Sequence, residues 1–423
     1  MWRTRESNGD DVYDFKLWKE HSESGKILHY EDNLALMICF DFVNPFGKQS
    51  TTKYSVGVIS MVILNLPKDI RYKKDNMFIL GVVPGPKEPK LHLNGFANLL
   101  IEQLRQLEEG CFFDGIVVRA ILFCVTGDIP ALRKILAFAG FGTHKACSKC
   151  KKNCSHLQGW SGTLASTPRK EMELESASNY YANSVQNQEQ DKLHIQKYFA
   201  RYSPFYSLKY FNVLRQHTID PMHNLFLGVT KAHFKYLLTI LSEKKLKILD
   251  SRIELIQKHL PVGLGRLPTQ IGKFYYSMKA EQFLNFALYI SIVALQNLLP
   301  KKHYLCWYML VFALRKFSSY QMNQKIAEEG HEAYIRYLDL FRDLAGVENI
   351  TINFHLVLHL KELLLDFGPI HVFWCFSFER FFSFFFKKKC HVFFCFFFVF
   401  FVVDSFHSFF FLSFFLSFFL SLQ

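Results

Sequence analysis

The chain has 423 residues, of which half are apolar and about a fifth are charged. This composition excludes a peptide hormone, a small disulfide scaffold and an intrinsically disordered chain, and the length suffices for a large buried core. Lys and Arg exceed Asp and Glu by 50 to 37, which gives a formal charge of +13. That excess favours a polyanionic partner such as nucleic acid, although a basic but otherwise ordinary enzyme has the same balance.

The ten cysteines are unevenly distributed along the chain. Three gather in Cys147-Ser-Lys-Cys150-Lys-Lys-Asn-Cys154, and most of the others stand alone in apolar runs. A secreted disulfide framework has a different pattern. The first residues lack the apolar core of a signal peptide. We therefore expect a reducing, intracellular compartment.

The first part of the chain predicts an α/β core. Apolar runs bounded by turn residues predict four strands, the fourth of which is buried on both faces, and the spacing of leucines and a proline start predict two helices. The predicted strands are 34–43, 54–66, 77–83 and 115–125, and the predicted helices are 93–108 and 130–138.

The second part of the chain predicts helices almost throughout. Residues 155–191 are rich in Ser, Asn, Gln and Glu, which is typical of an exposed loop or hinge. The predicted helices that follow are 221–241, 244–259, 279–298, 303–318, 322–344, 351–366 and a last core helix near 374–382. We expect an N-terminal extension (1–33), the first part of the core (34–144), a large mainly helical insertion (145–350) and C-terminal core helices (351–381).

Residues 382–423 form a Phe-rich tail. Of the 47 phenylalanines in the chain, 20 lie between Phe381 and Phe419, alternating with Ser, Leu and Val. Membrane insertion is one interpretation, but Asp404 and His407 interrupt the apolar runs, and the first run is too short to span a bilayer. Translation of pyrimidine-rich sequence from an imperfect gene model explains the composition better, so we expect an artefactual tail and no membrane partner.

Three acids predict a two-metal site of the kind that transfers phosphoryl groups. Asp41 ends the first predicted strand and Asp128 ends the fourth. If these strands lie side by side, both carboxylates reach one pair of Mg²⁺ or Mn²⁺ ions. Glu379, embedded in aromatic residues, would supply the third carboxylate, because a charge in such surroundings is costly unless something binds it.

Each acid also has a simpler interpretation. Asp41 would form the turn before Asn44-Pro45, Asp128 would cap the helix that opens at Pro130, and Glu379 would pair with Arg380. Taken together, in the order strand, strand and helix, the acids favour the metal site.

A second metal site is predicted from cysteines and histidines. Cys147 and Cys150 form half of a zinc site, and His355 and His359 add two ligands from one helical face. Such a zinc would be structural and would join the segment after Asp128 to the helix before Glu379. The alternatives are a reduced cysteine pair beside histidines that bond carbonyls, or Cys154 in place of one histidine.

The sequence leaves the roles of two further groups of residues undecided. Asp220-Pro-Met-His223 is a good helix start, with Asp as the cap, and His223 is either an auxiliary active-site residue or polar surface. Clustered basic residues would hold DNA phosphates, or they are solvated surface. They are Arg133, Lys134, Lys145, Lys149, Lys151 and Lys152.

Several segments together resemble the catalytic region of CACTA-type (En/Spm-like) cut-and-paste transposases, over residues 34–381. The segments are Asp41-Phe-Val-Asn-Pro-Phe46, the run from Tyr54 to Pro67, Gly81-Val-Val-Pro-Gly-Pro, Gly127-Asp-Ile-Pro with Cys147-Ser-Lys-Cys150, Ile219-Asp-Pro-Met-His223, and Phe367-Gly-Pro with Phe376-Ser-Phe-Glu379-Arg-Phe.

The resemblance implies an RNase H-like core with an Asp, Asp, Glu triad, matched here by Asp41, Asp128 and Glu379. Asp220 and His223 match the Asp-x-x-His motif of that family. Its distant kin, the Transib transposases and the RAG recombinase, carry a Cys-Cys/His-His zinc site with similar placement. These implications predict DNA strand cleavage and transfer with Mg²⁺ or Mn²⁺, transposon ends as substrate, a possible homo-oligomer and a nuclear location.

The chain also departs from the family. The Phe-rich tail replaces the sequence that follows the glutamate helix in relatives, and little precedes residue 34, where a DNA-binding region is expected. We therefore also expect that the chain is a fragment or a decayed copy. The alternative function is a catalytically inactive, zinc-stabilised DNA- or chromatin-binding protein derived from a transposase.

Overall fold

The computed structural model describes residues 7–46, 54–89, 93–140, 143, 147–152 and 167–387. The strands are β1 (Leu34–Val43), β2 (Val56–Ile63), β3 (Met77–Val83), β4 (Cys111–Phe113), β5 (Ile116–Val118) and β6 (Ala120–Gly127). The helices up to residue 216 are α1 (Lys16–Ser22), α2 (Lys68–Arg71), α3 (Asn94–Glu109), α4 (Ile129–Ile135), α5 (Glu171–Ser184), α6 (Gln188–Tyr198) and α7 (Val213–Gln216).

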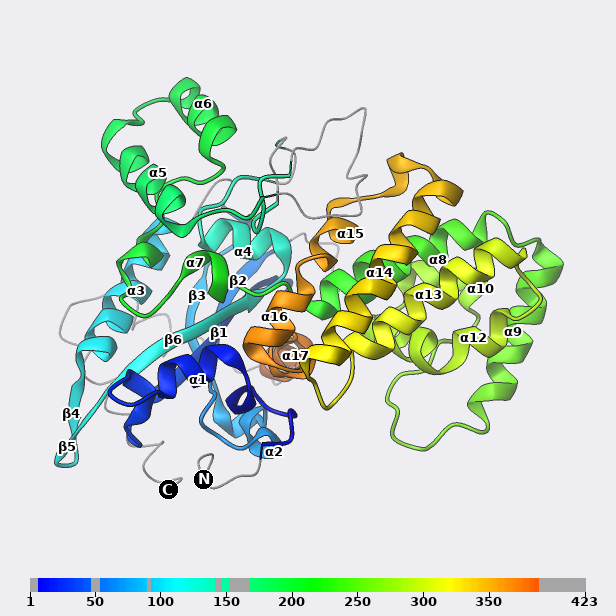
Figure 1. Cartoon of the computed structure of the whole chain (residues 1–423), viewed down its shortest axis with the longest axis horizontal. Helices are drawn as coiled ribbons and strands as arrows, with labels where there is room; N and C mark the ends of the chain where they lie inside the picture. Colours follow the sequence, from blue (N-terminus) through cyan, green and yellow to red (C-terminus); the bar gives the residue numbers. More distant parts are fainter. Residues whose placement is uncertain are drawn as a thin grey trace.

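The later helices form a block beside the sheet and then return to it (Figure 1). The block contains the π-helix η6 (Met222–Thr230), α8 (Lys231–Leu238), α9 (Glu243–Gln257), α10 (Ile271–Phe274), α11 (Ala280–Asn285), the π-helix η8 (Phe286–Ile290), α12 (Ser291–Leu295), α13 (Lys301–Phe317) and α14 (Gln324–Ala345). The helices that return are α15 (Ile352–Val357), α16 (Leu360–Phe367) and α17 (Phe376–Lys387).

The central sheet is mixed and has four strands in the order β3-β2-β1-β6. β1 runs antiparallel to β2 and parallel to β6, and the parallel ladder pairs Phe40 with Gly127. The C-terminal ends of β1 and β6 therefore lie side by side. This arrangement confirms the mixed α/β class and the adjacency of the first strand and the strand that precedes Asp128.

Alternating residues of β1 face opposite sides of the sheet. Leu36 and Ile38 join the apolar core under α3, α4 and α7. Met37 and Cys39 join the other core, which continues through α1, α16 and α17 into the helical block. The sheet is thus the middle layer between two sets of helices (Figure 1). Asp41 has the same parity as Met37 and Cys39, so its side chain lies on the α17 face.

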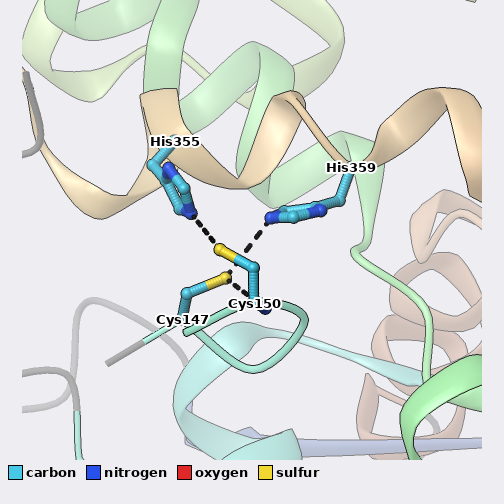
Figure 2. Close-up of side chains that lie close together, drawn as sticks. All are labelled: Cys147, Cys150, His355 and His359. Carbon is cyan, nitrogen blue, oxygen red and sulfur yellow. Dashed lines mark hydrogen bonds between the residues drawn. The ribbon is translucent and has the colours of Figure 1, made fainter. Parts of the chain in front are cut away.

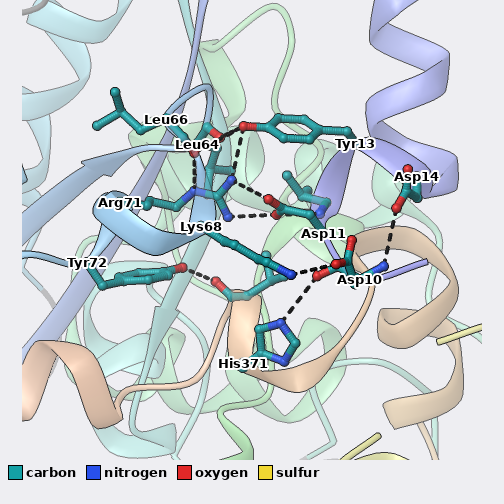
Figure 3. A network of polar contacts seen from close by, with 12 residues as sticks. Asp10, Asp11, Tyr13, Asp14, Leu64, Leu66, Lys68, Arg71, Tyr72 and His371 are labelled. Atoms are coloured by element: carbon teal, nitrogen blue, oxygen red, sulfur yellow. Dashed lines mark hydrogen bonds and ion pairs between the residues drawn. The ribbon is translucent and has the colours of Figure 1, made fainter. Parts of the chain in front are cut away.

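The N-terminal segment packs tightly against the core. Arg71 donates to both carboxylate oxygens of Asp11 at 2.8 and 2.9 Å, and both side chains are almost fully buried. The Tyr13 hydroxyl donates to the carbonyls of Leu64 and Leu66 (Figure 3). From residue 7 onward, the predicted N-terminal extension therefore belongs to the same folded body as the sheet.

Two local predictions were wrong. The polar stretch predicted as a loop contains the whole of α5 and the start of α6. These helices have weak periodicity, and tertiary contacts stabilise them: Ser178 Oγ accepts from the backbone N–H of Ser203, and Arg201 pairs with Asp191 at 2.7 Å. The single predicted strand 115–125 is in fact β5 and β6.

The short hairpin of β4 and β5 was not predicted, although a signal for it exists. Asp114 and Gly115 connect the two strands with φ of 45° and 84°, which are the values of a tight two-residue hairpin turn. The dipeptide Asp-Gly is typical of such a turn.

Most helices of the second half were predicted, although α10 was not and several predicted helices are subdivided. The predicted helix 351–366 is two helices, α15 and α16, with a break at Leu358 and His359. In the described part of the chain, no helix combines the length and apolar character needed to cross a membrane. The Phe-rich tail from residue 388 lies outside the described residues.

Candidate active site and metal centre

Asp41 and Asp128 stand at the same edge of the sheet. Asp41 follows Phe40 in β1 and Asp128 follows Gly127 in β6, and the parallel ladder pairs Phe40 with Gly127. Asp41 Oδ1 accepts from the backbone N–H of Phe42 at 2.7 Å, and Asp128 Oδ1 accepts from that of Ala131 at 2.7 Å. Asp128 therefore caps α4, as its simpler interpretation predicts, while its charge also acts on Asp41.

Burial and nearby negative charges raise the proton affinity of both carboxylates. Burial, and after it the charge of neighbouring Asp128, raise the pKa of Asp41 to about 8. Burial also raises the pKa of Asp128, although the N–H of Ala131 opposes the rise. Two buried like charges are unfavourable unless a cation lies between them. The arrangement is therefore suited to binding divalent metal ions.

Glu379 reaches the same place from α17. A carboxylate oxygen of Asp41, a ring nitrogen of His223 and a carboxylate oxygen of Glu379 lie within 4.8 Å of one another. His223 Nε2 is 3.4 Å from Glu379 Oε1. The ion pairs of the described residues include none between Glu379 and Arg380, so the simpler interpretation of this glutamate has no support there.

Contacts at the start of α17 explain how Glu379 is placed. Thr126 Oγ1, near the end of β6, donates to the carbonyl of Phe373 at 2.8 Å. The backbone N–H of Cys375 donates to Asp220 Oδ1 at 2.8 Å, and the N–H of Glu379 donates to the carbonyl of Cys375 at 2.9 Å. The first turn of α17 is thus held against the strand that carries Asp128.

Asp220 caps a helix, as its motif predicts, and its side chain also contacts His223. It accepts from the backbone N–H groups of Met222 and His223 at 3.1 and 3.0 Å, which caps η6. It also accepts from His223 Nδ1 at 2.7 Å. Burial disfavours the charged imidazole, but hydrogen bonds to Asp220, Cys375 and Glu379 outweigh burial and raise the pKa of His223. Asp220 therefore orients a cationic histidine toward Glu379.

The cysteines and histidines of the predicted zinc site also converge. The four ligand atoms of Cys147, Cys150, His355 and His359 lie within 4.8 Å of one another, and all four side chains are buried (Figure 2). Cys147 Sγ is 3.4 Å from His359 Nε2, and Cys150 Sγ is 3.3 Å from His355 Nε2. A tetrahedral zinc ion separates sulfur and nitrogen ligands by about 3.5 Å, so these distances fit zinc.

The surroundings of the sulfurs also fit a metal thiolate. The backbone N–H groups of Lys149 and Cys150 both point at Cys147 Sγ from 3.3 Å. Hydrogen bonds from Cys147 and from the two imidazoles lower the pKa of Cys150, whereas burial raises the pKa of Cys147. The hydrogen-bond donors around the two cysteines favour ionisation of one sulfur, and a bound cation would stabilise both as thiolates. Cys154, the alternative ligand, lies outside the described residues.

Two of the predicted DNA-binding residues do not fit that role. Arg133 is 5% exposed and donates to the carbonyl of Ala139. Lys149 Nζ donates to the carbonyls of Leu214 and His217, and burial lowers its pKa to about 7. Both charges therefore serve carbonyl groups inside the protein and are not available to a phosphate.

The other predicted basic residues lie nearer the surface. Lys134 forms an ion pair with Glu88, and Lys151 pairs with Glu173 at 2.6 Å. Lys152 is partly exposed, and Lys145 lies outside the described residues.

One residue beside the candidate site was missed in the sequence. The Cys375 sulfur lies within 4.8 Å of ligand atoms of Asp220 and His223, and 3.9 Å from that of Cys39. Its position four residues before Glu379, directly before the helix that carries the glutamate, was the signal available.

Residues 12–184 match the family model of the transposase family tnp2. This similarity supports a transposase. The matched segment contains Asp41, Asp128 and the Cys147–Cys150 turn, and it ends before Asp220 and Glu379. It also begins inside the N-terminal segment that packs on the sheet. No curated protein matches the chain.

Proposed function

We propose that this chain is a transposase catalytic region that cleaves DNA and transfers the strand by two-metal phosphoryl transfer. The observation that carries the proposal is that ligand atoms of Asp41 and Glu379 lie within 4.8 Å of each other at the sheet edge where Asp128 follows the neighbouring parallel strand. The similarity to transposase family tnp2 supports the same function independently. The segments quoted from the sequence favour the CACTA type with an Asp, Asp, Glu triad, distantly akin to Transib and RAG recombinases.

An RNase H-like core is the architecture we infer for the sheet and its helices. In support, β1 lies between an antiparallel β2 and a parallel β6, and α4 follows β6 directly. A parallel bridge between Val125 and His217 adds one more chain segment beside β6. On this proposal, residues 34–144 and 351–381 form the core, and 145–350 are an insertion.

In the proposed reaction, two Mg²⁺ or Mn²⁺ ions would supply the activation of water and then of a DNA 3′-hydroxyl, and would stabilise charge on the leaving oxygen. Asp41 and Asp128 would hold the ions from the sheet edge, and Glu379 would complete the site from α17. Asp220 holds His223, and His223 contacts Glu379, so this pair would keep the third carboxylate directed at the other two.

The Cys2His2 site would hold a structural zinc with no position open to substrate. It would join the turn that follows α4 to α15 and the start of α16, and therefore stabilise the path of the chain toward Glu379. The proposed substrate, transposon ends, implies DNA as partner and the nucleus as the site of action.

The test is nicking of supercoiled DNA by the purified chain with Mn²⁺ or Mg²⁺. The variant Asp128→Asn is suited to it because asparagine keeps the helix cap of α4 but removes the charge that binds a cation. We expect it to lose at least about 100-fold in nicking rate, because removing a charge from the metal site weakens stabilisation of the transition state. Asp114→Asn, at the hairpin turn, is the matched control and should nick like the wild type.

Two results would speak against the proposal. Equal nicking by Asp128→Asn and the wild type would mean that the activity does not use this site. A wild-type chain that binds DNA and retains zinc but cleaves with neither metal would favour the inactive binding protein.

A further inference from the structure

A basic hollow lies between the Cys147–Cys150 turn and the helices α5 and α6. Its volume is about 620 Å³, which is in the range of small-molecule sites. The segments around it pack directly on one another: the backbone of Lys151 donates to the carbonyl of Thr167, and that of Arg169 donates to the carbonyl of Lys149. The side chains used in the argument are Lys151, Arg169, Met172, Glu173, Lys197 and Tyr198.

Positive charge is in excess in this hollow. Three basic side chains line it, and Glu173 is the acid among its lining residues. That glutamate is already paired with Lys151 at 2.6 Å. Arg169 and Lys197 therefore leave the hollow with a positive potential, which favours an anion.

Arg169 is held rigidly in the wall. Its Nε donates to the carbonyl of Cys147 at 2.9 Å, and its guanidinium carbon lies 4.1 Å from the centre of the Phe199 ring. These contacts fix the guanidinium before any ligand arrives, which reduces the entropy lost on binding. The hollow is therefore a preorganised cationic site.

The same hollow has a flat apolar side. Met172 is 79% exposed and lines the hollow. Tyr198 also lines the hollow; Lys197 Nζ lies 4.8 Å from the centre of its ring, and the centre of the His194 ring lies 4.7 Å from it. An aromatic face beside a cation is the combination that proteins use for an unpaired base and its phosphate.

We propose that this hollow binds one unpaired nucleotide of a DNA strand. Lys197 and Arg169 would hold the phosphate, and the Tyr198 ring would stack on the base while Met172 covers its edge. The inference rests on the proposed function, because it takes DNA as the partner, and it adds a contact for single-stranded DNA away from the three acids.

The test compares two labelled DNA probes by fluorescence anisotropy in the Asp128→Asn background, where cleavage is prevented. One probe is a short blunt duplex, and the other is the same duplex with a single-stranded overhang. We expect the overhang probe to bind more tightly. Tyr198→Ala should weaken binding of the overhang probe by about tenfold, because stacking is lost. Lys197→Gln should weaken binding of the overhang probe by about three- to tenfold. It should also reduce the number of counterions released on binding, read from the salt dependence, by about one.

Matched variants separate the proposed contacts from general effects. Lys192→Gln removes a charge from the same helix outside the hollow, and Tyr198→Phe keeps the ring; both should bind the overhang probe as the parent does. Equal losses for both probes, or equal effects of Lys192→Gln and Lys197→Gln, would overturn the inference. If the parent binds neither probe, it is the proposed DNA function that fails.

Discussion

The ring of His233 lies inside an aromatic enclosure in the helical block. The ring centres of Trp307, Tyr337 and Phe341 lie 5.0, 5.5 and 4.8 Å from its own. Its Nδ1 has no hydrogen-bond partner in the described part of the protein, and burial lowers the pKa of His233 to about 3. The folded protein therefore keeps this histidine neutral.

The neutral state of His233 predicts a pH dependence of stability. In the unfolded chain, histidine takes up a proton near pH 6.5, whereas the folded site does so only near pH 3. The stability that His233 contributes is thus present above about pH 6.5 and is lost as the pH falls toward 3. Between pH 7 and pH 5 this loss amounts to about 2 kcal/mol. Between pH 7 and pH 5, the free energy of unfolding of His233→Phe should therefore fall by about 2 kcal/mol less than that of the wild type. Urea denaturation at the two pH values measures this difference.

The control for this prediction is the exposed His259. The exchange His259→Phe should leave the pH dependence of the free energy of unfolding as in the wild type. If His233→Phe and the wild type lose the same free energy between pH 7 and pH 5, then His233 is accessible to protons in the folded protein.

At the scale of elements, the Cys2His2 site joins the Cys147–Cys150 turn to α15 and the start of α16, more than 200 residues later in the chain. We expect one zinc ion per chain by atomic absorption. Removal of zinc by a chelator should lower the free energy of unfolding by about 4 kcal/mol, the value for a ligand at 1,000 times its dissociation constant. Cys150→Ser should have the same effect without a chelator.

Cys111→Ser, on β4, is the control for that experiment and should retain both zinc and stability. If the four residues are instead a reduced cysteine pair beside histidines, a different result is expected. The purified protein would contain no zinc, and a chelator would not change its melting temperature.

At the scale of the whole molecule, the Asp11–Arg71 pair joins the N-terminal segment to the chain between β2 and β3 (Figure 3). Both side chains are 1% exposed. Arg71→Met leaves a buried carboxylate without its cation and should lower the free energy of unfolding by about 3–5 kcal/mol. Lys74→Met, which changes an exposed lysine three residues later, should have little effect.

A double variant separates loss of the pair from loss of the arginine alone. Asp11→Leu combined with Arg71→Met removes both charges, so part of the lost stability should return. If the double variant is as unstable as the sum of the single variants, the N-terminal segment does not gain its stability from this pair.

The fold was predictable where a pattern is local and strong. The strands 34–43 and 77–83 were predicted to the residue, because turn residues bound each apolar run. The adjacency of β1 and β6 was a condition of the predicted metal site that the element order allows, and the sheet meets it. The helices α5 and α6 were missed because their buried faces are small, and contacts from Ser203 and Arg201 are needed to order them.

The sequence predicted which residue types make up the candidate sites, but it did not predict how buried each side chain is or what it contacts. The same kind of side chain, a lysine near the cysteine pair, is partly buried and bonded to carbonyls at Lys149, whereas it is exposed at Lys151. The difference comes from the carbonyls of Leu214 and His217, which belong to a segment more than 60 residues away. Local sequence therefore did not distinguish a charge that supports the fold from one that faces solvent.

The amino-acid sequence alone determined which acids, cysteines and histidines are available and on which kinds of element they stand, because periodicity and turn residues are local properties of the chain. Tertiary structure alone decided that Glu379 meets His223 and Asp41, and that three cations surround one hollow beside Tyr198. The physical reason is that distances between segments far apart in the chain are set by packing of the cores on both faces of the sheet, and no single segment encodes them.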